Sequence, residues 1–449
     1  MSKTLRLITF ALFILVLTAC KITVTPSEYS DNFFGKNNAT PKAPFLYCAI
    51  PDKYNTGADE NTEFNHLDED GLINGVYIKI DTRSDKTYIF TSYIPKNIPQ
   101  PPAKVTIENY DFSDGNFKVY NPDRYDEKKV ITFKNCKFKG FANSGPYDDN
   151  KVTVIFDHCS FGGGVSEVNI KMNWCKIGHF PTDAMNPLKN FTAQYCYIYD
   201  LCCEGNDKGT HIDGFQIYGR GTTVGGNIMI DNVRFEIPSI YYEGNKSAVN
   251  ACVMFQLEYG NVKNCTFSNL ICNGGGKWYP IYYKKTKCKQ DSELYKKGES
   301  FSESNCCLKN VKVSNNFGTI FYPTEHYEDG NIKNVEHFDK LYVSSIFYDD
   351  SGKYHVICTN DTSIDKTLTV QTEGGEYTFD MPHYPSNWAL GGEIDKKVNP
   401  NESLVDSEGR SYKTYRFEDL PIDIDCVLKN ASGFIRCLDD GEEILKINL

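Results

Sequence analysis

The segment Thr210–Gly219, Thr-His-Ile-Asp-Gly-Phe-Gln-Ile-Tyr-Gly, holds three side chains that could take part in chemistry. His211, Asp213 and Gln216 place an imidazole, a carboxylate and a carboxamide close together at the start of a predicted strand. An imidazole can act as a general base near neutral pH. We therefore take His211 and Asp213 as candidate catalytic residues and Gln216 as a candidate substrate-binding residue.

Two other segments carry side chains of the same kinds, Thr182–Asn186 and Val253–Leu257. If they occupy neighbouring coils of one stack, Asp183 lies against Asp213, and a carboxamide column forms from Asn186, Gln216 and Gln256. Paired carboxylates can act as acid and nucleophile or base in glycoside hydrolysis, because crowding separates their pKa values. The alternatives are that the pair holds a hard cation such as Ca²⁺, or that Asp213 and Gln216 only hydrogen-bond backbone while Gly214 permits a tight turn.

A repeated pattern indicates how these segments are stacked. From about residue 105, an apolar strand is followed by two residues, the second often Asn, and then by an apolar-x-apolar triplet. The pattern recurs at Phe133–Phe138, Phe156–Phe161, Met172–Ile177, Ala193–Ile198, Ile230–Phe235, Val262–Phe267 and Leu308–Val313. A base period of about 22 residues with loop insertions fits this recurrence. The two-residue bend suits Asn, because Asn tolerates the left-handed backbone conformation.

The recurrence resembles the right-handed parallel β-helix of the pectate-lyase-like superfamily over residues 100–325. That resemblance implies a substrate groove along the strand that contains Asp213 and the loop before it. The string His211-x-Asp213-Gly214-x-Gln216 also resembles the Asn-Thr-Asp-Gly-x-Asp signature of polygalacturonase-like glycosidases, although His211 and Gln216 depart from it. An antiparallel β-sandwich, which also has evenly spaced short strands, is the alternative fold.

The phase of the repeat assigns side chains to the two sides of the coil wall. Five cysteines point inward, where a free thiol behaves as a small buried hydrophobe: Cys136, Cys159, Cys175, Cys196 and Cys265. The middle residues of the triplets point outward and several are basic, among them Lys137, Lys176, Arg234 and Lys312. This stripe predicts either a contact for a polyanion, with Arg234 as a substrate-binding residue, or an ordinary solvated face.

The N-terminus predicts export. Lys3 and Arg6 precede an apolar run, Leu7–Ala19, which is too short to span a bilayer and has the flanks of a signal peptide. Leu17-Thr18-Ala19-Cys20 resembles the lipobox of bacterial lipoproteins, which implies cleavage before Cys20 and lipidation of its sulfur. Several acyl chains on one residue would give stable membrane anchoring.

The residues after the cysteine and the overall charge complete this picture. Lys21 resembles a signal for sorting to the bacterial outer membrane, and residues 20–45 read as a linker that holds the body off the membrane. The chain carries 59 Asp and Glu against 48 Lys and Arg, a formal net charge of −11. This acidity argues against nucleic acid as a partner. We expect a monomer attached to the cell envelope.

The predicted fold class is all-β: a right-handed parallel β-helix followed by a small antiparallel, sandwich-like module. We assign residues 1–19 to the signal peptide, 46–104 to an N-terminal cap, 105–325 to the β-helix and 326–449 to the C-terminal module. The module has alternating strands such as Tyr354–Thr359 and Thr367–Gln371. It is either a carbohydrate-binding appendage or a cap without a ligand.

An insertion after Cys272 carries Trp278 and Tyr279, which we take as substrate-binding because aromatic faces stack on sugars; the alternative is an ordinary loop.

The sequence thus predicts a surface-anchored polysaccharide lyase or glycoside hydrolase acting on an acidic polysaccharide. The alternative is a non-catalytic adhesin or glycan-binding lipoprotein, since a fold does not fix function. An open, convergent Asp183/Asp213/His211 cluster would favour the enzyme. Buried side chains that satisfy one another would favour the binding protein.

Overall fold

The chain folds as an all-β protein in the computed structural model, which confirms the predicted class. No described segment is a helix long and apolar enough to cross a membrane. The predicted signal peptide, most of the linker and Cys20 lie outside the described part of the chain. The described residues are 45–91, 98–120, 127–144, 151–180, 182–201, 212–219, 226–237, 249–257, 261–274, 280–285, 302–314, 321–322, 332–383, 403–405, 411–413, 417 and 420–449.

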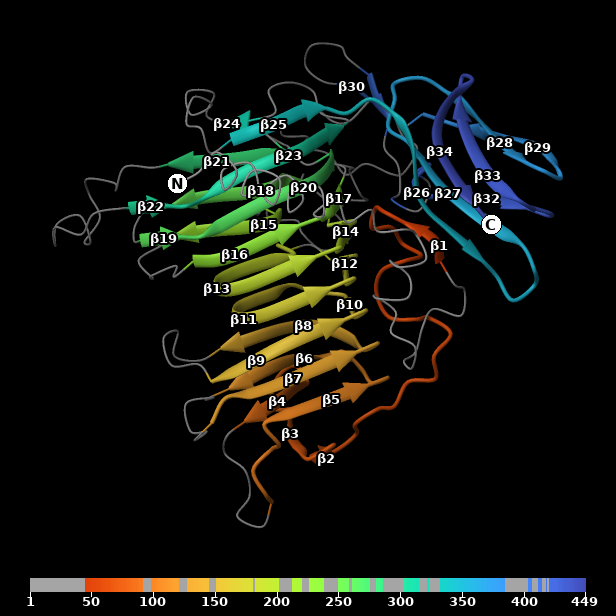
Figure 1. Ribbon diagram of the computed structural model, residues 1–449. Coiled ribbons are helices and arrows are strands. Elements are labelled where there is room, and N and C mark those ends of the chain that lie inside the picture. Colours follow the sequence, from red (N-terminus) through yellow and green to blue (C-terminus); the bar gives the residue numbers. More distant parts are fainter. Residues whose placement is uncertain are drawn as a thin grey trace, which may run out of the picture.

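Parallel strands stack on one another along most of the molecule, in a β-helix-like arrangement (Figure 1). Within the described residues the first ladder has nine strands, each parallel to the next. They are β4 (Thr87–Thr91), β6 (Asp111–Tyr120), β8 (Lys137–Ser144), β11 (Val165–Asn173), β13 (Met185–Gln194), β15 (Ile212–Gly219), β18 (Val249–Leu257), β21 (Ile281–Lys285) and β24 (Phe321–Tyr322).

Two further parallel ladders are formed by the strands between these. The second contains β5 (Lys104–Glu108), β7 (Lys129–Lys134), β9 (Val152–Asp157), the second halves of β11 and β13, β16 (Gly226–Asp231), and the first halves of β20 (Cys265–Gly274), β23 (Cys307–Ser314) and β25 (Ile332–His337). The third contains the first residues of β6 and β8, then β10 (Ser160–Phe161), β12 (Lys176–Gly178), β14 (Tyr197–Tyr199), β17 (Arg234–Ile237), and the second halves of β20, β23 and β25. A short parallel pair, β19 (Asn261–Lys263) and β22 (Ser302–Ser304), lies apart from them.

The bend between the second and third ladders is formed by one residue per coil with positive φ. Asn135, Asn232, Asn269 and Asn310 occupy it with φ between 49° and 54°, as the Asn pattern predicts. Asn310 donates to Asn269 across one coil at 3.0 Å. In the middle of the stack an aromatic ladder replaces the asparagines: His158, Trp174 and Tyr195 lie with their rings stacked.

The interior of the stack is apolar, and the five cysteines expected to point inward are all fully buried, which confirms that prediction. Cys265 nevertheless belongs to a different column. It pairs with Ile228 in the second ladder, and Leu270 takes the inward position after the bend residue Asn269. The sequence pattern misplaced it because Asn264 precedes it. That asparagine belongs to a second ladder at another corner, which links Asn169, Asn190, Asn227, Asn264 and Asn305.

The C-terminal module consists of two four-stranded antiparallel sheets around a shared core that includes Val356, Val370 and Ile435. One sheet has the order β1 (Phe45–Cys48), β26 (Leu341–Tyr348), β27 (Tyr354–Asn360), β32 (Ile424–Leu428). The other has the order β29 (Gly375–Met381), β28 (Lys366–Thr372), β33 (Phe434–Asp439), β34 (Glu442–Asn448). A two-stranded sheet, β30 (Ser403–Val405) and β31 (Ser411–Lys413), is separate.

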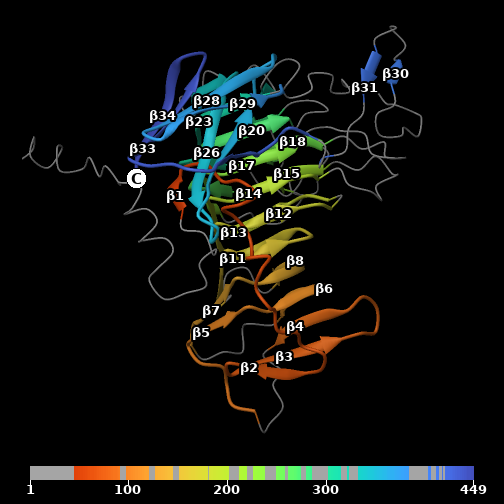
Figure 2. The ribbon, with the colours of Figure 1, turned by 90° about the vertical axis from the view of Figure 1, so that its right-hand side faces the viewer.

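Residues 46–104 do not form a single cap, which corrects the sequence-based boundary. Figure 2 shows β1 beside β26, at the edge of the module's first sheet. Residues 49–66, here called the strap, then run along the outside of the stack towards its first coil (Figure 1). There the antiparallel pair β2 (Gly71–Ile73) and β3 (Val76–Asp81) covers the stack, because β3 pairs antiparallel with β4.

The strap is held to the stack by hydrogen bonds at successive coils. Gly57 donates its backbone N–H to Trp174 at 2.8 Å, Ala58 donates to Ser160 Oγ at 2.8 Å, and Asp59 donates to Asn135 Oδ1 at 2.6 Å. Gly57 has a φ of 83°, and an added Cβ would lie 2.6 Å from Ser160 Oγ. Only glycine fits there without displacing the strap.

Candidate functional site

The structure brings four of the predicted site residues together on the first ladder. Met185 of β13 lies opposite Phe215 of β15, which places Asp183 beside Asp213, as the coil alignment predicts. Asp213 donates its backbone N–H to Asp183 Oδ1 at 2.8 Å, and Asn186 donates to Asp183 Oδ2 at 3.3 Å. Gln216 in turn donates to Asp213 Oδ2 at 2.8 Å. The four residues therefore form one hydrogen-bonded group across two coils, which is here called the Asp213 group.

Burial divides this group. Asp213 is 0% exposed, whereas Asp183, Asn186 and Gln216 are half-buried. A fully buried carboxylate that accepts a hydrogen bond from a neighbouring amide has a structural role in the strand. It is not accessible to a polysaccharide. This placement favours the scaffold role for Asp213 over the catalytic role.

Gly214 also has a structural role, but it differs from the tight turn that the sequence indicates. It lies inside β15, and an added Cβ would meet Phe235 Cδ1 at 2.5 Å and the Cys252 carbonyl oxygen at 2.7 Å. The residue is needed because the interior of the stack approaches the strand closely.

Gln256 does not extend the carboxamide column, which corrects the predicted register. Gln216 lies opposite Met254 and its amide donates to Met254 Sδ at 3.6 Å, while Gln256 lies opposite Tyr218. The pairing of β15 with β18 is regular from Asp213, opposite Ala251, to Gly219, opposite Leu257, and this register lies two residues from the one that the coil alignment predicts. His211, Trp278 and Tyr279 lie outside the described residues.

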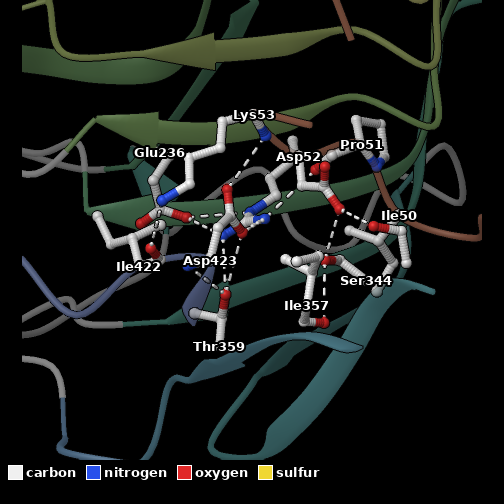
Figure 3. Close-up of polar contacts among 12 residues, drawn as sticks. Ile50, Pro51, Asp52, Lys53, Glu236, Ser344, Ile357, Thr359, Ile422 and Asp423 are labelled. Atoms are coloured by element: carbon white, nitrogen blue, oxygen red, sulfur yellow. Dashed lines mark hydrogen bonds and ion pairs between the residues drawn. The ribbon is translucent and has the colours of Figure 1, made fainter. Parts of the chain in front are cut away.

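Arg234 faces outward from the stack, as predicted, but it is 0% exposed because the strap and the module cover it. Its Nη2 lies 2.7 Å from Glu236 Oε2, and its Nη1 lies 2.6 Å from Asp423 Oδ1 of the module. Nη1 also donates to the Pro51 carbonyl of the strap at 3.3 Å. Figure 3 shows Pro51 of the strap, Glu236 of the stack and Asp423 of the module close together. The prediction that Arg234 contacts a substrate is wrong, since no ligand reaches a covered guanidinium.

Two more buried carboxyl groups belong to the same region, which is here called the junction (Arg234, Glu236, Asp423, Asp52 and Asp361). Asp52 of the strap accepts hydrogen bonds from Ser344 at 2.7 Å and from Ser345 at 2.6 Å. Asp361 of the module accepts from Ser314 of the stack at 3.1 Å and from Asn273 at 3.2 Å. The junction therefore joins strap, stack and module through polar groups that water does not reach.

Burial changes the proton affinity of these acids. It raises the pKa of Asp52 to about 6, that of Asp361 to about 7 and that of Glu236 to about 8. The negative charge of Asp423 acts in the same direction on all three groups. One guanidinium faces four carboxyl groups among the described residues here, and excess buried negative charge favours the protonated forms.

Sequence reasoning found Arg234 but missed its partners. Glu236 follows two positions later on the same outward face of β17, so it could have been identified from strand alternation. Asp52, Asp361 and Asp423 come from segments far away in sequence, and no local pattern connects them with Arg234.

The basic outward positions nearer the first coil are also covered. Glu60 of the strap lies between two of them, with Lys137 Nζ at 3.1 Å and Lys176 Nζ at 3.6 Å. At Lys137 and Lys176 the stripe is therefore neither a polyanion site nor a freely solvated face, because an acidic residue of the strap lies on it, whereas Lys312 is exposed.

No group of three or more His, Cys, Asp or Glu side chains in the described ranges is placed to hold a metal ion. Asp183 and Asp213 form a pair in which one carboxylate binds the backbone of the other residue, so the structure lends no support to a Ca²⁺ site there. Comparison of the chain with protein-family models, with curated proteins and with solved structures found no match.

Proposed function

We propose that this chain is an exported, lipid-anchored carbohydrate-binding protein built on a right-handed parallel β-helix, and that the glycan lies along the first ladder. The observation that carries the proposal is the pair of half-buried carboxamides Asn186 and Gln216, on adjacent coils beside a fully buried Asp213. Right-handed coils agree with the general handedness of parallel crossover connections.

The outward row of this ladder suits an extended polymer. In register order it comprises Lys118, Ala142, Ser166, Asn186, Gln216, Met254 and Tyr282. Successive side chains are separated by the spacing of paired strands, about 4.8 Å. Such a row offers hydrogen-bonding amides and an aromatic ring along one line, the combination that orients and holds a sugar chain.

Binding without cleavage is favoured because Asp213 is buried and hydrogen-bonded within the wall. The second candidate function, a lyase or glycoside hydrolase acting on an acidic polysaccharide, is favoured by one observation. Asp183 is half-buried, so a carboxylate does reach the surface of the row. General acid–base chemistry needs such a group within hydrogen-bonding reach of the substrate.

The experiment uses a blocking substitution that removes no hydrogen bond of the Asp213 group. Purified protein is tested against a panel of neutral and acidic polysaccharides, with and without calcium, for binding and for release of products. Ser166→Trp places a bulky ring in the row and is expected to lower affinity at least tenfold. Thr192→Trp is the matched control, since Thr192 is also half-buried on β13 but lies in the second ladder.

The outcomes separate the two functions. Binding that Ser166→Trp weakens and Thr192→Trp leaves intact, with no product formed, supports the binding protein. Product formation that Asp183→Asn abolishes supports the enzyme. Equal affinities for both tryptophan variants would show that the row is not the binding surface.

The lipid anchor is tested separately. Cys20→Ser is expected to give an unlipidated protein that no longer partitions with membranes. If the variant still sediments with membranes in the absence of detergent, the anchor lies elsewhere in the chain.

A further inference from the structure

A cavity of about 550 Å³ lies where the strap, the module and the bend of the stack meet. Its walls come from strap residues 53–61, from the module at Phe347 and residues 349–351, and from Asn135, His158 and Lys176 of the stack. None of these residues belongs to the outward row of the first ladder. Cavities of this size at the boundary between structural units are common ligand sites.

Aromatic rings form one wall of the cavity. Tyr54 and Phe347 are half-buried, with ring centroids 5.8 Å apart. Phe347 is held in place by other rings, because its centroid lies 5.4 Å from that of Phe45 and 4.6 Å from that of His355, on which it stacks. His355 is itself held by Asp425 at 2.9 Å and by Asp349 at 3.1 Å. The wall is thus a supported apolar surface that keeps its shape without a ligand.

The charged groups around the cavity are largely compensated within the protein. Glu60 is paired with Lys137 and Lys176, and the Lys53 ammonium lies 5.0 Å from the Tyr54 ring centroid and donates to the Ile422 carbonyl at 3.5 Å. The Asp59 carboxylate accepts hydrogen bonds from Asn61 and Thr62. A strongly charged ligand would find little unpaired opposite charge here and would lose hydration on entering.

Hydrogen-bonding capacity is nevertheless available beside the rings. A carboxylate has about four lone-pair positions, so Asp59 can accept from a ligand in addition to its own partners. Asp350 is exposed at the edge of the cavity. Apolar faces next to carboxylate acceptors match a molecule that has one apolar face and several hydroxyl donors.

We propose that this cavity is a second carbohydrate site, which takes one or two residues of a neutral saccharide with the apolar sugar face on Tyr54 and Phe347. The hydroxyl groups donate to the carboxylates of Asp59 and Asp350. Because the strap and the module both line the cavity, the site exists only when the module is docked on the stack. It lies apart from the first ladder and does not depend on the function proposed for the row.

The test compares neutral and acidic tetrasaccharides of the same linkage and size, namely those of galactose and of galacturonate, together with tetramers of glucose and mannose. Affinity is measured by calorimetry. We expect a neutral tetramer to bind, Tyr54→Ala to weaken it at least tenfold, and Tyr54→Phe to retain it because the ring is kept. Asn61→Trp, which fills the cavity from an exposed position, is expected to abolish binding and covers the case in which Tyr54→Ala fails to fold.

The row variant distinguishes this site from the one proposed above. Ser166→Trp should leave cavity binding unchanged, and Asn61→Trp should leave binding to the row unchanged. The cavity proposal is overturned if no neutral tetramer binds, if galacturonate binds better than galactose in a Tyr54-dependent way, or if Ser166→Trp alone removes binding. A peptide that binds in a Tyr54-dependent way while every saccharide fails would overturn it as well.

Discussion

The Asp213 group and the junction around Arg234 are built from the same kinds of residues but differ in what lies over them. Both lie on strands of the parallel ladders. In the Asp213 group, amides donate hydrogen bonds to the carboxylates, and in the junction the donors include both amides and hydroxyls. At the first ladder the side chains around Asp213 remain half-buried. At the third ladder the strap and the module close over Arg234 completely. An outward direction in a repeat is therefore not the same as exposure.

The largest effect is expected from removing the only guanidinium of the junction. Arg234→Met leaves the Asp423 carboxylate buried without its ion-pair partner and removes two hydrogen bonds to Glu236, which together we expect to cost about 3–5 kcal/mol. Urea unfolding should show this loss, and limited proteolysis should show release of the module. The control is Lys312→Met in the same outward column, where an exposed lysine should change stability by no more than about 0.5 kcal/mol. Equal stabilities of the two variants would mean that the junction does not hold the module.

The pH dependence of stability is the next largest effect. Burial raises the pKa of Asp52 to about 6, of Asp361 to about 7 and of Glu236 to about 8, so the folded protein binds more protons than the unfolded chain in this range. Stability from a raised pKa is fully present below the unfolded value and is lost as pH rises through the folded value. We therefore expect the urea midpoint to decrease as the pH rises from 5 to 8. The free energy of unfolding should decrease by an amount on the order of a few kcal/mol.

Glu236→Gln isolates the part of this dependence that belongs to Glu236. The glutamine is neutral at every pH, so the decline between pH 5 and pH 8 should become shallower. Exposed acids whose pKa is lowered, such as Asp114 beside Lys86, titrate below this window and leave the slope unaffected. A stability that rises with pH over this interval in the wild-type protein would contradict the assignment.

A substitution in the first ladder should lower the stability less than the loss of Arg234 does. Asp213→Ala removes the acceptor of the Gln216 amide in a buried setting, which we expect to cost about 1–3 kcal/mol and to lower the melting temperature by several degrees. The matched control is the exposed Asp68→Ala, which should stay within about 0.5 kcal/mol. An unchanged melt for Asp213→Ala would restore Asp213 as an open cleft carboxylate and strengthen the enzyme hypothesis.

The alignment of Asp183 with Asp213 was predictable because one residue pattern repeats at each coil. Asn135, Asn232 and Asn310 mark the bends, since few other residues adopt a positive φ at low cost. The alternation after each bend then decides which side chains enter the apolar interior. The error at Gln256 was a shift of two residues in the register of β18 against β15. The displacement of Cys265 arose because a second asparagine ladder looks the same in sequence.

The amino-acid sequence thus determined the all-β class, the parallel coils and the inward cysteines, because these depend on contacts repeated at short separations. Only the tertiary structure decided which outward residues stay accessible. Phe45–Cys48 joins the module, and the strap then returns along the stack over Ser160 and Lys176, a path that no local pattern encodes. The burial of Arg234 depends on Asp423, 189 residues away in the chain. Burial by segments that are distant in the sequence is decided by how the surfaces of strap, stack and module pack together. The sequence therefore showed the charge of Arg234 but not its role.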